Sequence, residues 1–316
     1  MRVVRVVARD FRGYREARAE LGDGVTVVSG PNGAGKTNLL EAIYFGCTGR
    51  SCRTANEREV VRFGAAAARV VVDACGDDGP HELSVGFAPG EPKRMRFDRA
   101  PVERLIDLAD RPLVSVFLPD RLELIKGPPT LRRAHLDQFV AALWPARAAT
   151  RRAYGQALAQ RNALLGRIRS GRGSVPSLWA WNAQLAGHGV ALMADRARAV
   201  EAMSDAFCRL GAELGLDGEP AIAYRPRSQA TDADELAGEL AARTESDLDR
   251  GFTSHGPHRD ELAMTRAGRD VRVYGSQGPQ RLALLAPLLA KRETTAHSRG
   301  EPPLMPLDDV MSELDA

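Results

Sequence analysis

The stretch GPNGAGKT, which begins at Gly30, places glycine, lysine and threonine at the spacing GxxxxGK[ST]. Glycines let backbone N–H groups turn inward and surround phosphate oxygens. Lys36 would then reach the β- and γ-phosphates of a nucleotide, and the hydroxyl of Thr37 would bind Mg²⁺. An ordinary glycine-rich turn is the alternative, and the flanking segments favour the phosphate-binding loop.

Those flanking segments are expected to hold the loop between a strand and a helix. VTVVS at 25–29 is rich in valine and follows the turn residues GDG, which is typical of a short strand. NLLEAIYFG, after Thr37, has the spacing of an amphipathic helix, whose positive end would face a bound anion. Arg12 and Tyr14 precede the loop and are candidates either for contact with adenine or ribose or for packing in a sheet.

Two acids near the end of the sequence are the second chemical feature, because LMPLDD places Asp308 and Asp309 after an apolar run. A phosphate-binding loop needs a further acid for Mg²⁺, usually at the end of an apolar strand, and Asp308 suits that role. Asp309 would point elsewhere and could orient or activate the attacking water. Acids after apolar runs also cap helices, so this pair gains its meaning from the loop. Pro306 should remove one ladder hydrogen bond from the expected strand.

The third feature is YGSQGPQR, which opens the helical run LALLAPLLA. A serine and a glycine at a helix start present a hydroxyl and N–H groups to an anion. Taken alone, an ordinary serine cap explains them better. Pro279 lacks an N–H but is tolerated in a first turn, whereas Pro287 should kink the helix that follows.

Composition describes an ordinary globular protein of 316 residues, 44% hydrophobic and 27% charged. Apolar runs are too short to span a bilayer, and the four cysteines lack a paired pattern, so we expect reduced thiols in the cytoplasm. The net charge of +3 is unevenly spread, with an excess of nine basic residues over 121–172 and of seven acidic residues over 201–250. The basic block fits either a phosphate backbone or a solvated helix face.

The pattern along the chain changes from strands to helices. Strands are expected at 2–8, 68–74 and 81–87, and helical spacing dominates 130–215, with a break at 170–177. A further short helix is expected near 232–243. The simplest account is an α/β domain into which a helical subdomain is inserted.

The three motifs, in this order, resemble the ABC-type ATPase heads that include SMC proteins. Further segments resemble the RecF family of bacterial recombination-repair ATPases, namely FRGYREARAEL, GKTNLLEAIY, TGRSCRT, LPDRLELIKGPPTLRRAHLD, YGQALAQRNALL, SHGPHRDEL, YGSQGPQR and LDDVMSELD. The resemblance runs from about residue 10 to the last residue. It implies an α/β fold, an ABC/SMC-type P-loop ATPase head with an inserted mainly helical lobe. The implied divisions are 1–112 for the first lobe, which contains the Walker A loop, and 113–299 for the mainly helical second lobe, which contains the signature motif. Residues 300–316, with the Walker B acids and the D-loop, would return to the first lobe.

The resemblance also assigns roles to residues. It implies catalytic roles for Lys36 and Asp309, and Mg²⁺ ligands in Thr37 and Asp308. Nucleotide would be bound by the Walker A residues Gly30, Asn32, Gly33, Gly35, Lys36 and Thr37, and by the signature residues Ser276, Gln277 and Gly278 of a partner subunit. Residues 312–315 would form the D-loop.

The activity that follows from the resemblance is a slow, ATP-driven switch in DNA repair. ATP would dimerise two heads around DNA at single-strand gaps, with RecR and RecO as partners, and hydrolysis would release the DNA after recombinase loading. Pro279 stands where the family's signature has glutamine, and the sequence ends before the family's last strand, γ-phosphate-sensing residue and closing helices. These departures favour, as an alternative, a scaffold that binds DNA or RecR without cycling ATP. A transport ATPase subunit is a further alternative.

Overall fold

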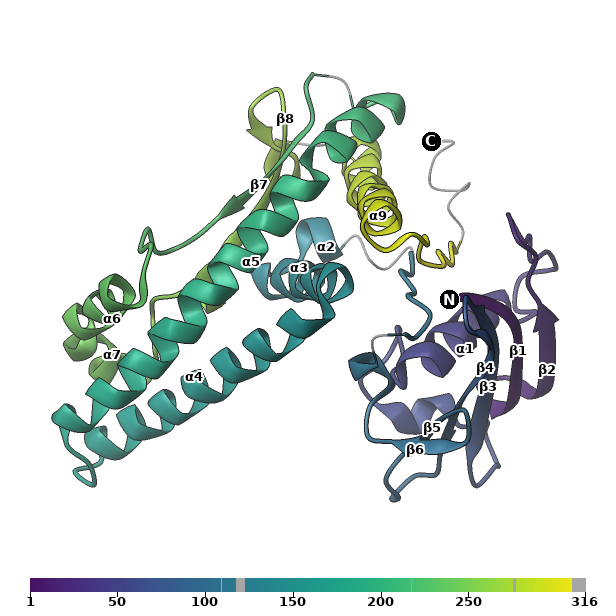
Figure 1. Cartoon of the computed structure of the whole chain (residues 1–316), viewed down its shortest axis with the longest axis horizontal. Helices are drawn as coiled ribbons and strands as arrows, with labels where there is room; N and C mark the ends of the chain where they lie inside the picture. Colours follow the sequence, from purple (N-terminus) through teal and green to yellow (C-terminus); the bar gives the residue numbers. More distant parts are fainter. Residues whose placement is uncertain (109, 118–122, 217, 275–276, 309–316) are drawn as a thin grey trace. The chain divides into compact units, whose positions relative to one another are not determined.

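The computed structural model describes residues 1–108, 110–117, 123–216, 218–274 and 277–308 (Figure 1). The chain divides into two compact units, Met1–Pro119 with Thr295–Ala316, and Asp120–Thr294.

A six-stranded antiparallel sheet forms the first unit, in the order β2-β1-β3-β4-β5-β6. Its strands are β1 Arg2–Phe11, β2 Tyr14–Glu20, β3 Ala68–Gly76, β4 Gly79–Phe87, β5 Arg94–Phe97 and β6 Ala100–Val102. The helix α1, Lys36–Thr48, packs against β1, β3 and β4, and the 3-10 turns η1 Glu57–Val60 and η2 Leu105–Asp107 complete the unit. The strands expected at 2–8, 68–74 and 81–87 and the helix after residue 35 are confirmed.

The core of this unit follows from the period of two in β3. Val70 and Val72 are buried with the residues two positions on either side, while the residues between them are more exposed. The helix α1 covers this face so closely that a Cβ on Gly46 would lie 2.4 Å from a methyl carbon of Val72. Phe45 of the same helix meets Phe11 of β1 with ring centroids 5.5 Å apart. Helix α1 is therefore held firmly on the sheet.

The prediction of a strand at 25–29 is wrong. These residues have no regular structure, and the side chains of Val25 and Val27 are 94% and 80% exposed. In the part of the chain that the structure describes, no strand pairs with this segment. Valine-rich sequences prefer extended structure because they pack on neighbouring strands, so without a neighbour the preference is not realised.

A short parallel pairing carries residues 304–308. Leu304 pairs with Val114 and Leu307 pairs with Phe117. The N–H of Leu304 donates to Leu113 at 2.8 Å, and its carbonyl accepts from Ser115 at 2.9 Å.

Further along this pairing, the carbonyl of Pro306 accepts from Phe117 at 2.9 Å, and the N–H of Asp308 donates to Phe117 at 3.1 Å. In a parallel ladder the missing step would be a donation from residue 306 to Ser115, which proline cannot make. The expected loss of one ladder hydrogen bond at Pro306 is confirmed.

The second unit is mainly helical, with a three-stranded antiparallel sheet in the order β7-β8-β9. Its helices are α2 Glu123–Lys126, α3 Pro129–Leu143, α4 Ala148–Arg169, α5 Leu178–Glu213, α6 Ala233–Ala242, α7 Thr244–Arg250, α8 Val271–Tyr274 and α9 Gln277–Arg299, the last of which ends in the first unit. Its strands are β7 Ala221–Arg225, β8 Glu261–Arg266 and β9 Arg269–Asp270, and its 3-10 turns are η4 Pro145–Arg147, η5 Val175–Ser177 and η6 Pro257–Arg259.

The long helices α4 and α5 pack side by side as a hairpin (Figure 1). The break expected at 170–177 separates them, and the helix expected near 232–243 is α6; both expectations are confirmed. Helix α9 continues through Pro287 without ending.

Buried arginines hold the second unit together. Arg161 of α4 is fully buried and donates at 2.7 Å to Asp247, Thr253 and Asn182. Arg196 of α5 is also buried and donates to both carboxylate oxygens of Asp137, at 2.8 and 3.1 Å. Breaking such a pair leaves an uncompensated buried charge, which typically costs about 3–5 kcal/mol.

The stretch GPHRDE is a hub of this network. Asp260 is buried and accepts from Arg196 at 3.2 Å, from the backbone N–H of Arg227 at 2.7 Å, and from Tyr224. His258 accepts from the hydroxyl of Tyr154 at 2.7 Å and donates to the carbonyl of Thr253 at 2.9 Å. These contacts join α4, α5 and β7, so this stretch has a structural role.

His258 generates a pH-dependent stability. Burial lowers its pKa from 6.5 to about 4. The unfolded chain therefore takes up a proton near pH 6.5, whereas the folded chain does so only near pH 4. The contribution of the neutral His258 ring to the free energy of unfolding is fully present above pH 6.5. It is lost as the pH falls towards 4, by up to about 3 kcal/mol.

We predict that His258→Asn, whose amide keeps one donor and one acceptor, has a free energy of unfolding less sensitive to pH than the parent between pH 7 and 4. Urea titrations followed by tryptophan fluorescence measure it, since all three tryptophans lie in the second unit. His188→Asn, on α5 and outside this network, is the control and should follow the parent. Parallel curves for the parent and His258→Asn would contradict the prediction.

Candidate nucleotide site

The predicted phosphate-binding loop is a tight turn that leads into α1. Gly30, Gly33 and Gly35 all have positive φ, at 155°, 82° and 99°. Side chains with a Cβ rarely adopt these angles, so the glycines are needed where they stand. Lys36 opens the helix and donates from Nζ to the carbonyl of Gly30 at 2.7 Å and to that of Pro31 at 3.1 Å. The lysine thus reaches back across the loop that contains it.

Tyr14 braces the end of this loop. Its hydroxyl donates to the carbonyl of Gly35 at 2.8 Å. A Cβ on Gly35 would lie 2.7 Å from that hydroxyl oxygen. Burial raises the pKa of Tyr14, which keeps the hydroxyl protonated as a donor. The contact fixes the turn at the point where α1 begins.

The side chains of Thr37 and Asp308 meet, although 271 positions separate them in the sequence. The hydroxyl of Thr37 donates to the carboxylate of Asp308 at 2.7 Å. The first turn of α1 carries one partner, and the parallel pairing with Phe117 carries the other. A hydroxyl and a carboxylate together offer the hard oxygen donors that Mg²⁺ prefers, with its remaining positions left to water and phosphate. The two residues expected as Mg²⁺ ligands therefore lie together, and their donors fit the ion.

A buried acid that the sequence motifs did not indicate lies one turn after Thr37. Glu41 of α1 is fully buried and accepts from Arg12 at 2.7 and 2.9 Å. It also accepts from Ser51 at 2.5 Å and Arg53 at 3.3 Å. A glutamate on the apolar face of an amphipathic helix was the available signal, because such a charge needs partners. The guanidinium of Arg12 is engaged here and with the carbonyl of Glu59, so it acts as a brace for α1.

The remaining predicted site residues lie outside the described residues or in the second unit. Ser276, Asp309 and the D-loop at 312–315 lie outside the described residues. Gln277 and Gly278 open α9, as expected for a motif at a helix start. Their roles remain predictions.

Part of the basic block at 121–172 is used inside the second unit. Arg132 donates to Glu261 at 2.6 and 2.9 Å, Arg133 donates to the carbonyl of Asp260 at 2.7 Å, and Arg151 donates to Asp137 at 2.8 Å. With buried Arg161, these residues account for much of the excess positive charge. The charge count therefore overstates what this block can offer to a phosphate backbone.

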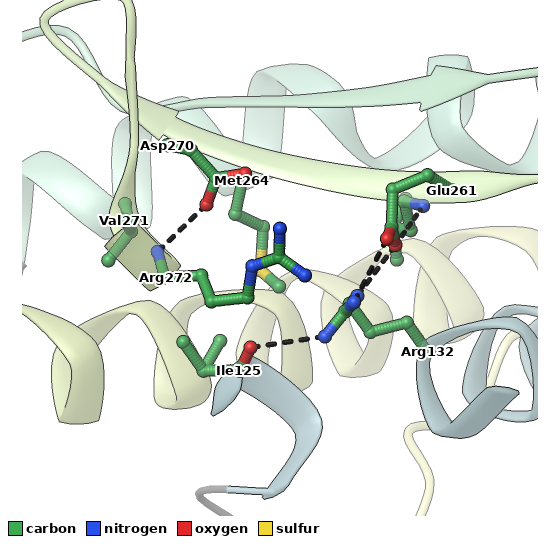
Figure 2. A pocket seen from close by; sticks show the side chains of 8 residues that line it. Ile125, Arg132, Glu261, Met264, Asp270, Val271 and Arg272 are labelled. Carbon is green, nitrogen blue, oxygen red and sulfur yellow. Dashed lines mark hydrogen bonds and ion pairs between the residues drawn. The ribbon is translucent and has the colours of Figure 1, made fainter. Parts of the chain in front are cut away.

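A small hollow in the second unit lies over one of these pairs (Figure 2). Ile125, Arg132, Glu261 and Arg272 are among the residues that line it. Arg132 and Glu261 bind one another at the edge of the lining set drawn in Figure 2, and Arg132 also donates to the carbonyl of Ile125 at 3.1 Å. We assign no ligand to this hollow, since its guanidinium donor Arg132 is already bound by the carboxylate of Glu261.

None of the described helices combines the length and the apolar character that a membrane crossing requires.

Comparison with known proteins gives consistent results. An AAA domain model matches residues 5–75. The DNA replication and repair protein RecF of Anaeromyxobacter sp. is 39% identical, and the match covers 100% of this chain and 86% of that protein. A solved structure of the recombination mediator protein RecF with ATP, described as part of the RecFOR pathway, has a TM-score of 0.89 at 27% identity over 100% of this chain and 86% of that one.

The Smc head domain of Pyrococcus furiosus shares the fold, with a TM-score of 0.55 at 16% identity over 99% of this chain and 91% of that one. The fold expected from the resemblance, an ABC/SMC-type P-loop ATPase head with an inserted mainly helical lobe, is confirmed. With 39% identity over its full length, this chain belongs to the RecF family of DNA replication and repair proteins.

Proposed function

We propose that this chain is an ATP-dependent DNA-binding protein of recombinational repair and replication restart. Two copies dimerise on ATP and clamp DNA at single-strand gaps, and slow hydrolysis releases the clamp. Its partners are RecR and RecO, it helps to load the recombinase, and it acts in the cytoplasm. The RecF relatives and the ATP-bound RecF structure of the RecFOR pathway support this proposal.

The observation that carries the proposal is the 2.7 Å contact between Thr37 and Asp308. A chain that no longer used nucleotide would have no reason to bring a loop threonine and a distant aspartate to one point. In the proposed site, Lys36 leaves the carbonyls of Gly30 and Pro31 and binds the β- and γ-phosphates. Thr37 and Asp308 hold Mg²⁺, which neutralises phosphate charge when bound.

The remaining roles follow from the family. Asn32 and the loop glycines surround the phosphates through their N–H groups. Asp309 orients the attacking water, and its reach, shorter than that of a glutamate, suits a slow reaction. Ser276, Gln277 and Gly278 bind the γ-phosphate held by the partner subunit. Each head therefore needs the other to complete its site.

A second candidate is a scaffold that binds DNA or RecR but does not cycle ATP. The exposed valines of residues 25–28 and the ladder hydrogen bond missing at Pro306 favour it, because both loosen the elements that present the loop and Asp308. ATP turnover that is abolished by Lys36→Ala would exclude this candidate.

We predict that light scattering finds a dimer with ATP and Mg²⁺ but a monomer with ADP, and that Lys36→Ala stays monomeric in both. The substitution removes the charge that would bind the transferred phosphate. Lys126→Ala is the matched control, because it removes an exposed lysine of the second unit. A parent chain that stays monomeric with ATP, and that binds gapped DNA no better with ATP than with ADP, would overturn the clamp.

We also predict that Gly35→Ala weakens binding of a fluorescent ATP analogue by about tenfold or more. The new Cβ would clash with the hydroxyl of Tyr14. In addition, alanine would have to adopt the left-handed backbone conformation of Gly35, which costs roughly 1–2 kcal/mol. Gly24→Ala is the control, since nothing lies within 4 Å of the Cβ it adds and its φ is not in the left-handed region. Equal affinity in both variants would show that this turn does not form the nucleotide site.

A further inference from the structure

The end of the α4–α5 hairpin carries an exposed tryptophan. Trp179, in the first turn of α5, is 78% exposed, and the nearby Val175 is 47% exposed. Trp181, two positions on, packs instead against the small core formed by Leu164, Leu165 and Leu178. The hairpin thus buries one indole to hold its end together and leaves the other in water. Single exposed apolar side chains are common on protein surfaces, so this indole gains meaning only together with the charges near it.

Three arginines lie at the same end of the hairpin as this tryptophan. Arg167 and Arg169 lie in the last turn of α4, and Arg172 lies in the connection to α5, all with exposed side chains. From Gln138 to Ala194 the sequence contains no aspartate or glutamate. Arginines in a last helical turn also suit the helix dipole. That explanation covers neither Arg172, which lies beyond the helix, nor the exposed indole.

Hydrogen bonds order the connection between α4 and α5 at the end of the hairpin. Backbone N–H groups of Gly171 and Arg172 donate to the carbonyls of Ile168 and Arg167, both at 2.9 Å. Ser174 and Ser177 share a hydrogen bond of 2.8 Å between their hydroxyls. These contacts fix the connection between the helices. The arginines and Trp179 are therefore presented from a rigid support, which lowers the entropy lost on binding.

We propose that this surface, formed by Arg167, Arg172, Val175 and Trp179, binds single-stranded DNA, with a base stacked on Trp179 and phosphates on the arginines. Stacking needs an unpaired base, because bases within a duplex already stack on one another. A protein partner could use tryptophan and arginine too. The absence of carboxylates from 138 to 194 and the single further exposed apolar side chain favour a polyanion. The inference rests on the proposed function for its ligand class.

The adjacent charges restrict the binding face. Helix α7 packs against α4 and carries Glu245 and Asp249, both exposed, while its Asp247 is buried against Arg161. Glu245 and Asp249 would repel phosphates on that side. A strand would therefore run over the connection and the first turn of α5, away from α7.

The test uses the full chain, without nucleotide, and fluorescein-labelled oligo(dT). We expect Trp179→Ala and the double variant Arg167→Glu with Arg172→Glu each to weaken binding by about tenfold. The double variant should also reduce the slope of log affinity against log salt by about 1.4, or about 0.7 for each phosphate that the chain no longer neutralises. Trp179→Phe keeps a stacking ring, so it should retain affinity but lose the tryptophan quenching that oligo(dT) causes in the parent.

Arg198→Glu is the matched control for charge. Arg198 is exposed on the same helix, beyond the acid-free stretch, and should change oligo(dT) affinity little. Circular dichroism melting checks that each variant folds. The proposal is wrong if the hairpin variants bind as tightly as the parent, if Arg198→Glu weakens binding as much as they do, or if the parent does not bind oligo(dT). It is also wrong if the variants lose a protein partner while binding oligo(dT) normally.

The oligo(dT) experiment can fail or succeed independently of the proposed ATP-dependent clamp. Loss of oligo(dT) binding in the hairpin variants supports this surface even when ATP has no effect on gapped DNA, which would remove the clamp alone. Conversely, an intact ATP-dependent clamp with unaffected hairpin variants removes this surface alone.

Discussion

The hydrogen bond between Thr37 and Asp308 is the contact on which the candidate nucleotide site depends, because it joins two points 271 positions apart. Asp308 arrives there through the parallel pairing with residues 113–117. Parallel segments cannot be joined by a tight turn and need a crossover connection. The whole second unit lies within that connection. Insertion of a helical unit between the two segments is thus compatible with the site, provided that the pairing itself holds.

That pairing rests on few hydrogen bonds. Pro306 cannot donate to Ser115, so next to Asp308 the ladder rests on Phe117, whose N–H donates to Pro306 and whose carbonyl accepts from Asp308. The other partner is better supported, since Tyr14 fixes Gly35 and the Arg12–Glu41 pair fixes the next turn of α1. The threonine side of the site is therefore the rigid side, and the aspartate side is the more adaptable one.

Local sequence could predict the loop, the α4–α5 break and the alternating strands, because glycine spacing and hydrophobic period act over a few residues. It could not predict that 25–29 would lack a strand, since strand formation depends on a neighbour elsewhere in the chain. The small sheet β7-β8-β9 could not be predicted for a related reason, as its strands are short and β7 pairs with β8 across the segment that contains α6 and α7. The same limit applies to charge. A count over 121–172 treats Arg132, Arg161 and Arg167 alike, yet only Arg167 is exposed.

This distinction bears on how the chain could meet DNA. A guanidinium that already binds Asp247 or Glu261 in a buried site cannot be recruited by phosphate without leaving that carboxylate uncompensated, at a cost of about 3–5 kcal/mol. Exposed arginines need only give up water. Electrostatic attraction along the hairpin should therefore be carried by the few side chains at its end, while the buried ones keep α4 and α5 rigid enough to present them. In this chain, arginine supplies both the internal support and the contact surface, and burial decides which role each residue has.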